Sequence, residues 1–554
     1  MTDHAKIEAT FTSSGALAEL NADDVALIQY PATELEAGPQ QVWLRRRDGG
    51  IRPVPLSGPA SGATIRPTRD GVALHGSLDA IRWALAWQQP ADGVFGWRLE
   101  LLNVGDRAVE VDAVHLFDPA LAPRASVERN EYYVSQYLDV TPVGEGRDVM
   151  LAVRQNMPHS GHPWLALSCT DGVAGWCTDA SQLHTADPAA GLDLSQDLPS
   201  VRLQHEHTLL GLQTLPITLE PNREHVVSFR AVYVREHVDA TSVHDMEIVR
   251  ARCSEVSWVV PEPTGPGIDA VPTLFAPVNW AHGEDLDEQS LLGLQPDPRG
   301  LERGPRGELW AYWSESGHVV AAAKEREVRR PHGHVLQAAT DIRPQACVSA
   351  STAWMSGTFA SQLVHGHAHL DPVLSVRRSY LGLLLADGLR IFVRDESTWN
   401  LLGTPSAWAV AGDSATWWYR FGDRTVQISV SLTKGSLDVS ADVDGGALDF
   451  LLFARRPGDD AAVFADARGR GIASTKEFLS ARSFRHRLLI SEEGAERSAL
   501  RLPDLISDDE GVQRLARVLP WLAMDARIHY QSPRGLEQFT GGAWGTRDVC
   551  QGPV

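Results

Sequence analysis

The chain has 554 residues, 43% of them hydrophobic, which is enough for about two to four domains that each bury a core. Its 50 Lys and Arg against 71 Asp and Glu give a net charge of −21, and a field of that sign repels nucleic acid and anionic lipid. We therefore expect neither nucleic acid nor a membrane surface as partner, whereas a neutral sugar is compatible with this charge.

The cysteines and the N-terminus indicate a cytoplasmic protein. No two of the five cysteines have CxxC spacing, so we expect neither a zinc site nor a disulfide framework. The first residues, MTDHAKIEATF, lack the apolar segment of a secretory signal. No apolar run approaches the roughly 20 residues that span a bilayer.

Most of the first 490 residues have the pattern of β-strands. Trp97, Leu99 and Leu101 alternate with polar positions, and a polar turn follows at 103–106. Alternation resumes from Val109 to Phe117. This pattern predicts a hairpin with one buried face.

A helix and a connector follow the first strand region. Ser242 and Asp245 have the spacing of a capping box, which predicts a helix start. The proline-rich stretch 255–307 contains an acidic, leucine-containing piece at 284–293. We interpret this stretch as a connector between two β regions, with a short helix inside.

Strand patterns resume near Leu309 and continue to about Ile490. Apolar residues alternate from Val426 to Leu432 and again from Leu437 to Val443, on both sides of a turn at 433–436. This predicts an antiparallel hairpin. Many such segments separated by Gly and Pro favour large β-sandwiches over parallel α/β units.

The pattern becomes helical near residue 505. Ser507 and Glu510 have capping-box spacing, and Pro520 should end the helix that follows. A second helical piece and a Gly-rich loop at 533–547 come next, and nothing in the last residues is typical of a domain end. We expect a chain that stops inside a helical domain and exposes an apolar face near Leu515, Leu519 and Leu522.

The last segment carries a family resemblance. Residues 533–538 read PRGLEQ and residues 543–553 read AWGTRDVCQGP. This run resembles the start of the catalytic (α/α)6 barrel of glycoside hydrolase family 94, in its 1,2-β-oligoglucan phosphorylase and cellobiose phosphorylase-like group. Further stretches similar to this group are Asn130–Tyr133, Arg154–Asn156, Arg330–His334, Ser351–Ser361, Leu374–Arg378 and Leu389–Val393.

The resemblance implies inverting phosphorolysis of a β-glucosidic bond to a sugar 1-phosphate. A carboxylic acid protonates the leaving oxygen, and inorganic phosphate, a co-substrate rather than a cofactor, attacks the opposite face. Because phosphate is the nucleophile, no second protein carboxylate is required. In the family the acid and the phosphate-holding residues lie later in the barrel. We therefore assign no catalytic residue here and expect this chain alone to be inactive.

The resemblance also implies one wall of a sugar site. Arg547 and Asp548 would hydrogen-bond the hydroxyls of the sugar, Trp544 would stack on its face, and Gln551 belongs to the same motif. The alternative is a structural ion pair between Arg547 and Asp548 at the barrel rim. Some cellobiose phosphorylases have an Asp after this Gln, where this chain has Gly552.

A run of alternating histidines could suggest a metal. His365, His367 and His369 would lie on one face of a strand, an arrangement that can ligate zinc or copper. No Cys or further His stands nearby in the sequence. We expect a surface strand and no metal.

The sequence thus predicts a mainly β protein with four parts. These are an N-terminal β-sandwich region at 1–255, a connector at 256–308, a second β-sandwich region at 309–500, and a linker helix with the start of an (α/α)6 barrel at 501–554. The predicted function is the front part of a β-glucan phosphorylase, a glycosyltransferase by reaction, with a β-glucooligosaccharide as partner and a homodimer as assembly. Alternatives are a carbohydrate-binding or scaffold module, and the front end of a larger cyclic glucan synthase-like transglycosylase.

Overall fold

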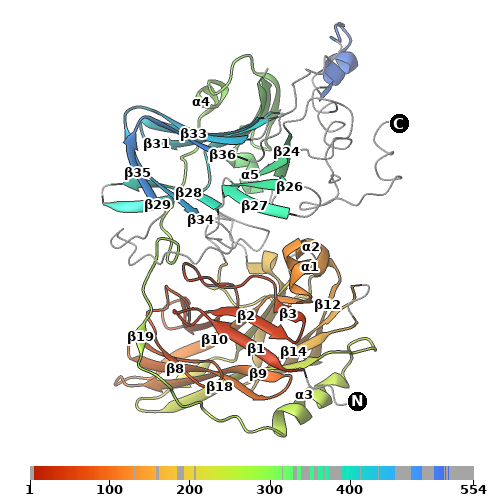
Figure 1. Ribbon diagram of the computed structural model, residues 1–554, viewed down its shortest axis with the longest axis vertical. Coiled ribbons are helices and arrows are strands. Elements are labelled where there is room, and N and C mark those ends of the chain that lie inside the picture. Colours follow the sequence, from red (N-terminus) through yellow and green to blue (C-terminus); the bar gives the residue numbers. More distant parts are fainter. Residues whose placement is uncertain are drawn as a thin grey trace.

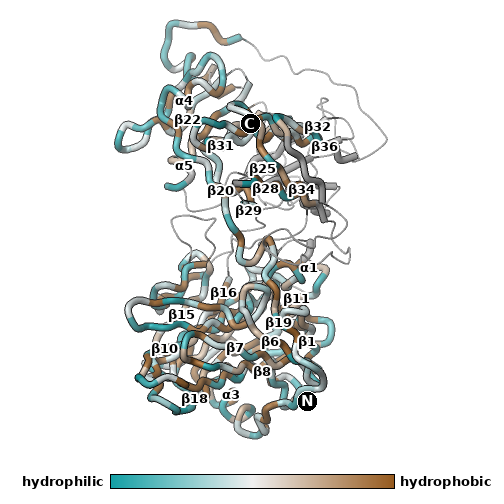
Figure 2. The backbone as a smooth tube through the Cα atoms, turned by 90° about the vertical axis from the view of Figure 1, so that its left-hand side faces the viewer, coloured by the Kyte–Doolittle hydropathy of each residue, from teal (hydrophilic) through white to brown (hydrophobic). Residues whose placement is uncertain are grey.

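The computed structural model shows two mainly β bodies stacked along the long axis of the molecule (Figure 1). Figure 2 shows β19 on the first body and β20 on the second, with apolar residues along the strands of both. The structure describes residues 5–129, 131–157, 161–183, 192–204, 208–314, 316–327, 333–337, 350–354, 360–365, 369–374, 388–395, 397–411, 413–433, 436–455, 476–489, 504–516, 518–519 and 522.

The first body contains three antiparallel sheets. The four-stranded sheet has the order β1 (Ile7–Phe11), β2 (Leu17–Ala22), β3 (Val25–Ile28) and β11 (Pro119–Ala122). The six-stranded sheet has the order β15 (Val173–Asp179), β16 (Thr208–Thr214), β10 (Val109–Phe117), β4 (Val42–Arg46) and β5 (Arg52–Pro55), with β17 (Ile217–Leu219) beside β10. The nine-stranded sheet has the order β12 (Leu138–Glu145), β13 (Asp148–Gln155), β14 (Trp164–Cys169), β18 (Glu224–Val234), β9 (Val94–Asn103), β8 (Ile81–Ala91), β7 (Val72–Leu78), β6 (Thr64–Pro67) and β19 (Ile268–Asp269). The helices of this body are α1 (Arg124–Arg129), α2 (Glu131–Gln136), the 3-10 helix η1 (Ala180–Leu183) and α3 (Asp245–Ser254).

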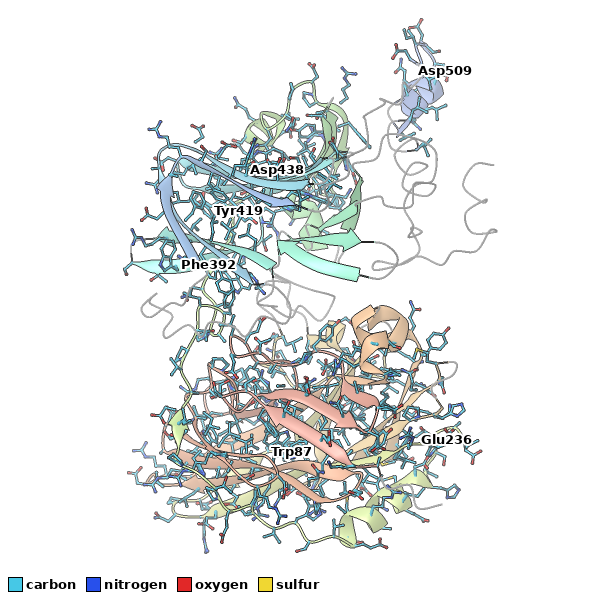
Figure 3. All side chains as sticks on the ribbon, viewed as in Figure 1. Trp87, Glu236, Phe392, Tyr419, Asp438 and Asp509 are labelled. Carbon is cyan, nitrogen blue, oxygen red and sulfur yellow. The ribbon has the colours of Figure 1, made fainter. Side chains whose placement is uncertain are left out.

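An aromatic row fills the space between the sheets of the first body. Trp87, Trp97 and Phe229 are cross-strand neighbours on β8, β9 and β18, so their side chains share one face of the nine-stranded sheet. Phe11 of β1 contacts both tryptophans, with ring centroids 5.6 and 5.9 Å apart. The four-stranded sheet therefore packs on the nine-stranded one, and Trp87 lies inside the first body (Figure 3).

The hairpin predicted between Trp97 and Phe117 is wrong. β9 pairs with β8 and β18 in the nine-stranded sheet, whereas β10 pairs with β4, β16 and β17 in the six-stranded one. The turn after Asn103 therefore carries the chain from one layer to the other. Both strands place apolar residues in the same core. Their alternation therefore reflects the burial of one face of each strand and not the pairing of the two strands with each other.

The second body contains two large sheets. A nine-stranded sheet has the order β20 (Trp280–Ala281), β29 (Thr398–Leu402), β28 (Gly388–Asp395), β27 (His369–Leu374), β26 (Ala360–His365), β25 (Ala350–Trp354) and β24 (Gly333–Gln337), with β34 (Leu448–Arg455) beside β28 and β35 (Lys476–Ala481) beside β34. Its pairs are antiparallel except β20–β29 and β27–β28. An antiparallel eight-stranded sheet has the order β21 (Arg299–Arg303), β22 (Leu309–Ser314), β23 (Gly317–Ala321), β30 (Ala407–Val410), β31 (Ser414–Phe421), β32 (Arg424–Thr433), β33 (Ser436–Asp444) and β36 (Ser483–Leu489). The helices of this body are α4 (Glu288–Leu292) and α5 (Ala322–Glu327).

The second predicted hairpin is confirmed. β32 and β33 pair in the expected register, with Val430 opposite Val439 and Thr433 opposite Ser436. The apolar members of both strands are buried in the core of the second body, except Val443, which is partly buried against it. The predicted mainly β, antiparallel architecture is therefore observed, whereas the predicted barrel helices after residue 522 lie outside the described residues.

The predicted helix starts are observed with different caps. Asp245 accepts a hydrogen bond from the backbone N–H of Ser242 at 2.7 Å, but the Ser242 side chain does not cap α3, so half of the capping box forms. Within the predicted connector, Asp287 caps α4 by accepting from the N–H of Ser290 at 2.7 Å. Near the C-terminus Asp509, rather than Ser507, accepts from the N–H of Val512 at 3.1 Å.

The expected apolar exposure near the C-terminus is present. Leu515 is 47% exposed, Leu522 is 51% exposed, and Leu519 is half-buried. Among the described residues, no helix combines the length and apolar character that a membrane crossing requires.

A buried histidine stands in the aromatic core of the first body. His115 of β10 is 5% exposed, and its ring centroid lies 5.2 Å from that of Phe229 and 6.3 Å from that of Phe117. Burial lowers the pKa of His115 from 6.5 to about 3, because the charged imidazolium would lose its hydration. The native state therefore holds a neutral imidazole.

Substitution of this histidine should change how stability depends on pH. The pKa of His115 is lower in the folded state than in the unfolded state. The contribution of His115 to the unfolding free energy is therefore fully present above the unfolded pKa of 6.5 and is lost as the pH falls toward about 3. In this window His115→Leu should make the fall in unfolding free energy shallower by up to about 1.4 kcal/mol per pH unit, measured by urea unfolding at several pH values. His244→Leu, at an exposed position, is the control. Identical slopes for His115→Leu and wild type would contradict the assignment.

Candidate functional site

The residues predicted to contact sugar, Trp544, Arg547, Asp548 and Gln551, lie outside the described residues. Of the histidine run, His365 ends β26 and His369 begins β27, and the two are cross-strand partners. The single strand predicted to carry all three histidines is therefore wrong, because His365 and His369 belong to two antiparallel strands, while the side chains and His367 lie outside the described part. The described residues therefore show the side-chain interactions of the two β bodies, which precede the predicted sugar site in the sequence.

A buried ion pair lies on the six-stranded sheet. Arg45 of β4 and Asp112 of β10 stand directly opposite each other in the strand register, and both side chains are fully buried. Nε of Arg45 donates to Oδ1 of Asp112 at 2.7 Å, and Nη2 donates to Oδ2 at 2.6 Å. This bidentate geometry is the one that best compensates a desolvated guanidinium.

Further polar side chains extend this pair to the surface. Nη1 of Arg47 donates to Oδ2 of Asp112 at 2.5 Å and to Oδ1 of Asp197 at 2.8 Å. Nε2 of Gln213 donates to the same two oxygens, at 3.0 and 2.8 Å. The result is a network of two arginines, two carboxylates and one amide, in which the formal charges balance. We call these five residues the arginine network.

The arginine network fastens a loop to the sheet. Nη1 of Arg45 donates to the carbonyls of Leu194 and Gln196, at 3.1 and 2.6 Å, and Oε1 of Gln213 accepts from the N–H of Leu198 at 2.9 Å. The hydrogen bond from Arg47 is the main cause that lowers the pKa of Asp197 to about 2. A carboxylate held ionised by arginines is suited to structure and not to proton donation.

A histidine–aspartate pair lies at the start of α3. Nε2 of His237 is 2.8 Å from Oδ1 of Asp245, and Nδ1 is 2.8 Å from the carbonyl oxygen of Asp239. The imidazole stacks on Trp164 with ring centroids 5.0 Å apart. Because both ring nitrogens are engaged, His237 has no free nitrogen to serve as a general base. The pair anchors the N-terminus of α3 to the segment that follows β18.

The described residues form no metal site. Among them, no group of three or more His, Cys, Asp or Glu side chains is placed to hold a metal ion. A surface groove beside β12 and α3 has no aromatic ring on which a sugar could stack. Its lining residues are Thr141, Pro142, Val143, Gly144, Glu145, Asp148, Ser242, Val243, Met246 and Arg250.

The motif at 154–156, which resembles family 94, has a positioning role. Gln155 is fully buried, and its Nε2 donates to the carbonyls of Ala120 and Val134 at 3.1 and 3.2 Å. Its Oε1 accepts from the N–H groups of Asn156 and Met157, both at 3.0 Å. All four hydrogen-bonding capacities of the amide are used. Gln155 thereby ties β11, α2 and the end of β13 together.

Sequence reasoning missed the arginine network and the His237–Asp245 pair. Arg45 and Asp112 are 67 residues apart, and no local spacing links them. The apolar alternation from Val109 to Phe117 predicts Asp112 on the polar face of its strand, so the sequence carried no signal that this carboxylate is buried.

Loss of one member of the buried pair should destabilise the first body. Arg45→Met leaves the Asp112 carboxylate buried with less compensation, and we expect a loss of about 3–5 kcal/mol in unfolding free energy by urea titration. The matched control is Arg46→Met, in the same strand, whose ion pair with Asp79 is partly exposed and should contribute no more than about 1 kcal/mol. Equal losses for the two variants would contradict the role given to Arg45.

Two protein families match the chain in succession. Residues 10–230 match the family described as the SOGP N-terminal domain. Residues 298–447 match the glycoside phosphorylase supersandwich domain. The two matches lie in the first and second β bodies, respectively.

A curated relative extends the similarity to nearly the whole chain. The chain is 26% identical, over 627 aligned positions, to a 1,2-beta-oligoglucan phosphorylase of Listeria innocua serovar 6a. The alignment covers 99% of this chain and 56% of the relative, so the chain spans little more than half of that protein's length.

Solved structures give weaker likenesses. A polysaccharide lyase aligns with 82% of this chain and 46% of its own, at 10% identity and a TM-score of 0.31. A putative aldose 1-epimerase from Escherichia coli K12 aligns with 41% of this chain and 98% of its own, at 9% identity and a TM-score of 0.24. Neither likeness informs the fold or the function. The two family matches in their order, together with the similarity over nearly the full chain, support a relationship between this chain and the glycoside phosphorylases similar to glycoside hydrolase family 94.

Proposed function

We propose that the chain is the front part of a β-glucan phosphorylase that acts on β-1,2-linked oligoglucans. The observation that carries this proposal is the similarity of 99% of the chain to a 1,2-beta-oligoglucan phosphorylase. The glycoside phosphorylase supersandwich domain within it supports the same reaction class. The alternatives of a binding module or a glucan synthase front end have no observation of their own in their favour.

The proposed reaction moves a glucosyl unit from a sugar oxygen to phosphate. The bond between the anomeric carbon and the leaving oxygen breaks, and a carboxylic acid supplies the proton that this oxygen takes up. An oxygen of inorganic phosphate forms the new bond on the opposite face, which inverts the anomeric centre. The products are a sugar 1-phosphate and a glucan that is one unit shorter. No redox step or cofactor is required.

In this proposal the last segment of the chain supplies one wall of the sugar site. The Asp548 carboxylate accepts hydrogen bonds from two sugar hydroxyls, and the Arg547 guanidinium donates to sugar oxygens. The indole of Trp544 packs against the C–H face of the ring, and the amide of Gln551 can both donate and accept. These four residues bind and orient the sugar, and we assign none of them the role of the acid.

Titration calorimetry with sugars tests the binding part of the proposal. We expect the 554-residue chain to bind β-1,2-glucooligosaccharides more tightly than β-1,4-glucooligosaccharides, because the relative is named for the β-1,2 linkage. Asp548→Ala and Arg547→Met should each weaken binding at least tenfold, since each removes a charged hydrogen-bonding partner worth about 1.5–3 kcal/mol. The matched control is Arg514→Met, which removes an exposed helix ion pair. Absence of heat with both sugars, or equal loss with the control, would contradict the site.

An assay for glucose 1-phosphate tests the reaction itself. We expect no phosphorolysis by these 554 residues, because the resemblance places the acid and the phosphate-holding residues later in the barrel. The assay mixes the purified chain with β-1,2-glucooligosaccharide and inorganic phosphate. Release of glucose 1-phosphate above a protein-free control would show that this expectation is wrong and that the acid lies within the chain.

A further inference from the structure

A loop of the first body enters the core of the second. The loop follows β3 and spans residues 29–41. Leu35 in this loop is fully buried, and it belongs to a hydrophobic cluster whose other buried members come from residues 274–453. Figure 1 shows the sheet that contains β28 and β34 facing the first body. Leu35 therefore completes a core that otherwise belongs to the second body.

A buried ion pair accompanies Leu35. Oε1 of Glu36 lies 3.8 Å from Nη2 of Arg390 on β28, and the two side chains are 7% and 0% exposed. The guanidinium carbon of Arg390 also lies 4.9 Å from the ring centre of Phe275. A charge in this position has lost its water, so it is tolerated when an opposite charge is buried beside it. Glu36 of the first body supplies such an opposite charge to Arg390 of the second.

The connector meets the loop at the same point. Oγ1 of Thr273 donates to the carbonyl of Leu35 at 2.5 Å and accepts from the N–H of Phe275 at 3.1 Å. The Phe275 ring packs edge-on against Phe392 of β28, with centroids 5.5 Å apart. The loop, the connector and β28 are therefore joined through both polar and apolar contacts.

The loop is held in shape by the first body. The N–H of Ala32 donates to the carbonyl of Leu17 at 3.1 Å, and the N–H of Ser13 donates to Oε1 of Glu34 at 2.9 Å. Oγ1 of Thr33 accepts from the N–H groups of Leu35 and Glu36, both at 3.3 Å. A loop already in its docked conformation loses little entropy on docking, which favours one fixed arrangement.

We propose that Leu35, Glu36 and Arg390 form a clamp that binds the two β bodies into one rigid unit. Arg390 lies in the stretch Leu389–Val393, which resembles family 94. The proposed reaction gives this stretch no role. The clamp explains why a strand buried on both faces carries an arginine. In this proposal the 29–41 loop, rather than the length of the connector, fixes the orientation of the two bodies.

Scanning calorimetry and small-angle scattering of the full chain test the clamp. The wild type should unfold in one transition. Glu36→Gln and Arg390→Met each remove one charge of the buried ion pair, so we expect two separated transitions, or one lowered by several degrees, and a larger maximum dimension. The double variant Glu36→Gln/Arg390→Met removes both charges and should recover part of the loss. The matched control is Arg394→Met, on the same strand, whose partner Asp449 is partly exposed.

The outcomes decide between a clamp and an ordinary contact. Recovery in the double variant identifies the pairing itself, since two independent losses would add. If Arg390→Met does not fold, the double variant is compared with Glu36→Gln alone. A smaller loss in the double variant than in Glu36→Gln then identifies the pairing. The proposal is overturned if Glu36→Gln retains the transition and the maximum dimension of wild type and of Arg394→Met. It is also overturned if the double variant is as disturbed as the sum of the single variants.

Discussion

The requirement that broad antiparallel sheets bury an apolar face governs both bodies. A sheet of eight or nine strands exposes too much apolar surface to be stable in water, so each sheet here needs a second layer. In the first body, Trp87 and Trp97 meet Phe11 from the opposing layer. In the second body, Trp417 and Tyr419 are buried in the corresponding core. The layers, and hence the loops at their ends, are placed by this packing.

Buried charges occur where separate segments have to meet in one arrangement. Apolar packing alone tolerates small slips, because one apolar contact is much like another. An ion pair out of water is less tolerant, since removal of either partner costs about 3–5 kcal/mol. Arg45 and Asp112 lie where the 193–198 loop joins its sheet, and Arg390 lies where the first body joins the second. In both places the charges specify position more than they add stability.

The sequence predicted local structure better than the partners of each element. Strand alternation at 426–443 predicted both burial and pairing correctly, because the two strands are neighbours in the sequence and also in the sheet. The same alternation at 97–117 predicted burial correctly but pairing wrongly, because the chain changes layer after Asn103. The alternation of apolar and polar residues shows which face of a strand is buried, but it does not identify the neighbouring strand. Arg45 and Asp112 escaped prediction for the same reason, since only the folded sheet brings them together.

The motifs that resemble family 94 divide into two physical kinds. Gln155 and Arg390 stand in such motifs, and both are buried side chains that join elements distant in sequence. The contacts of these two residues are structural. Arg547 and Asp548 are of the other kind, since the proposed function gives them contact with the sugar, and the sequence motif around them carried the family resemblance. Buried polar contacts such as those of Gln155 and Arg390 permit few alternative packings, so they favour one arrangement of the β elements that they join.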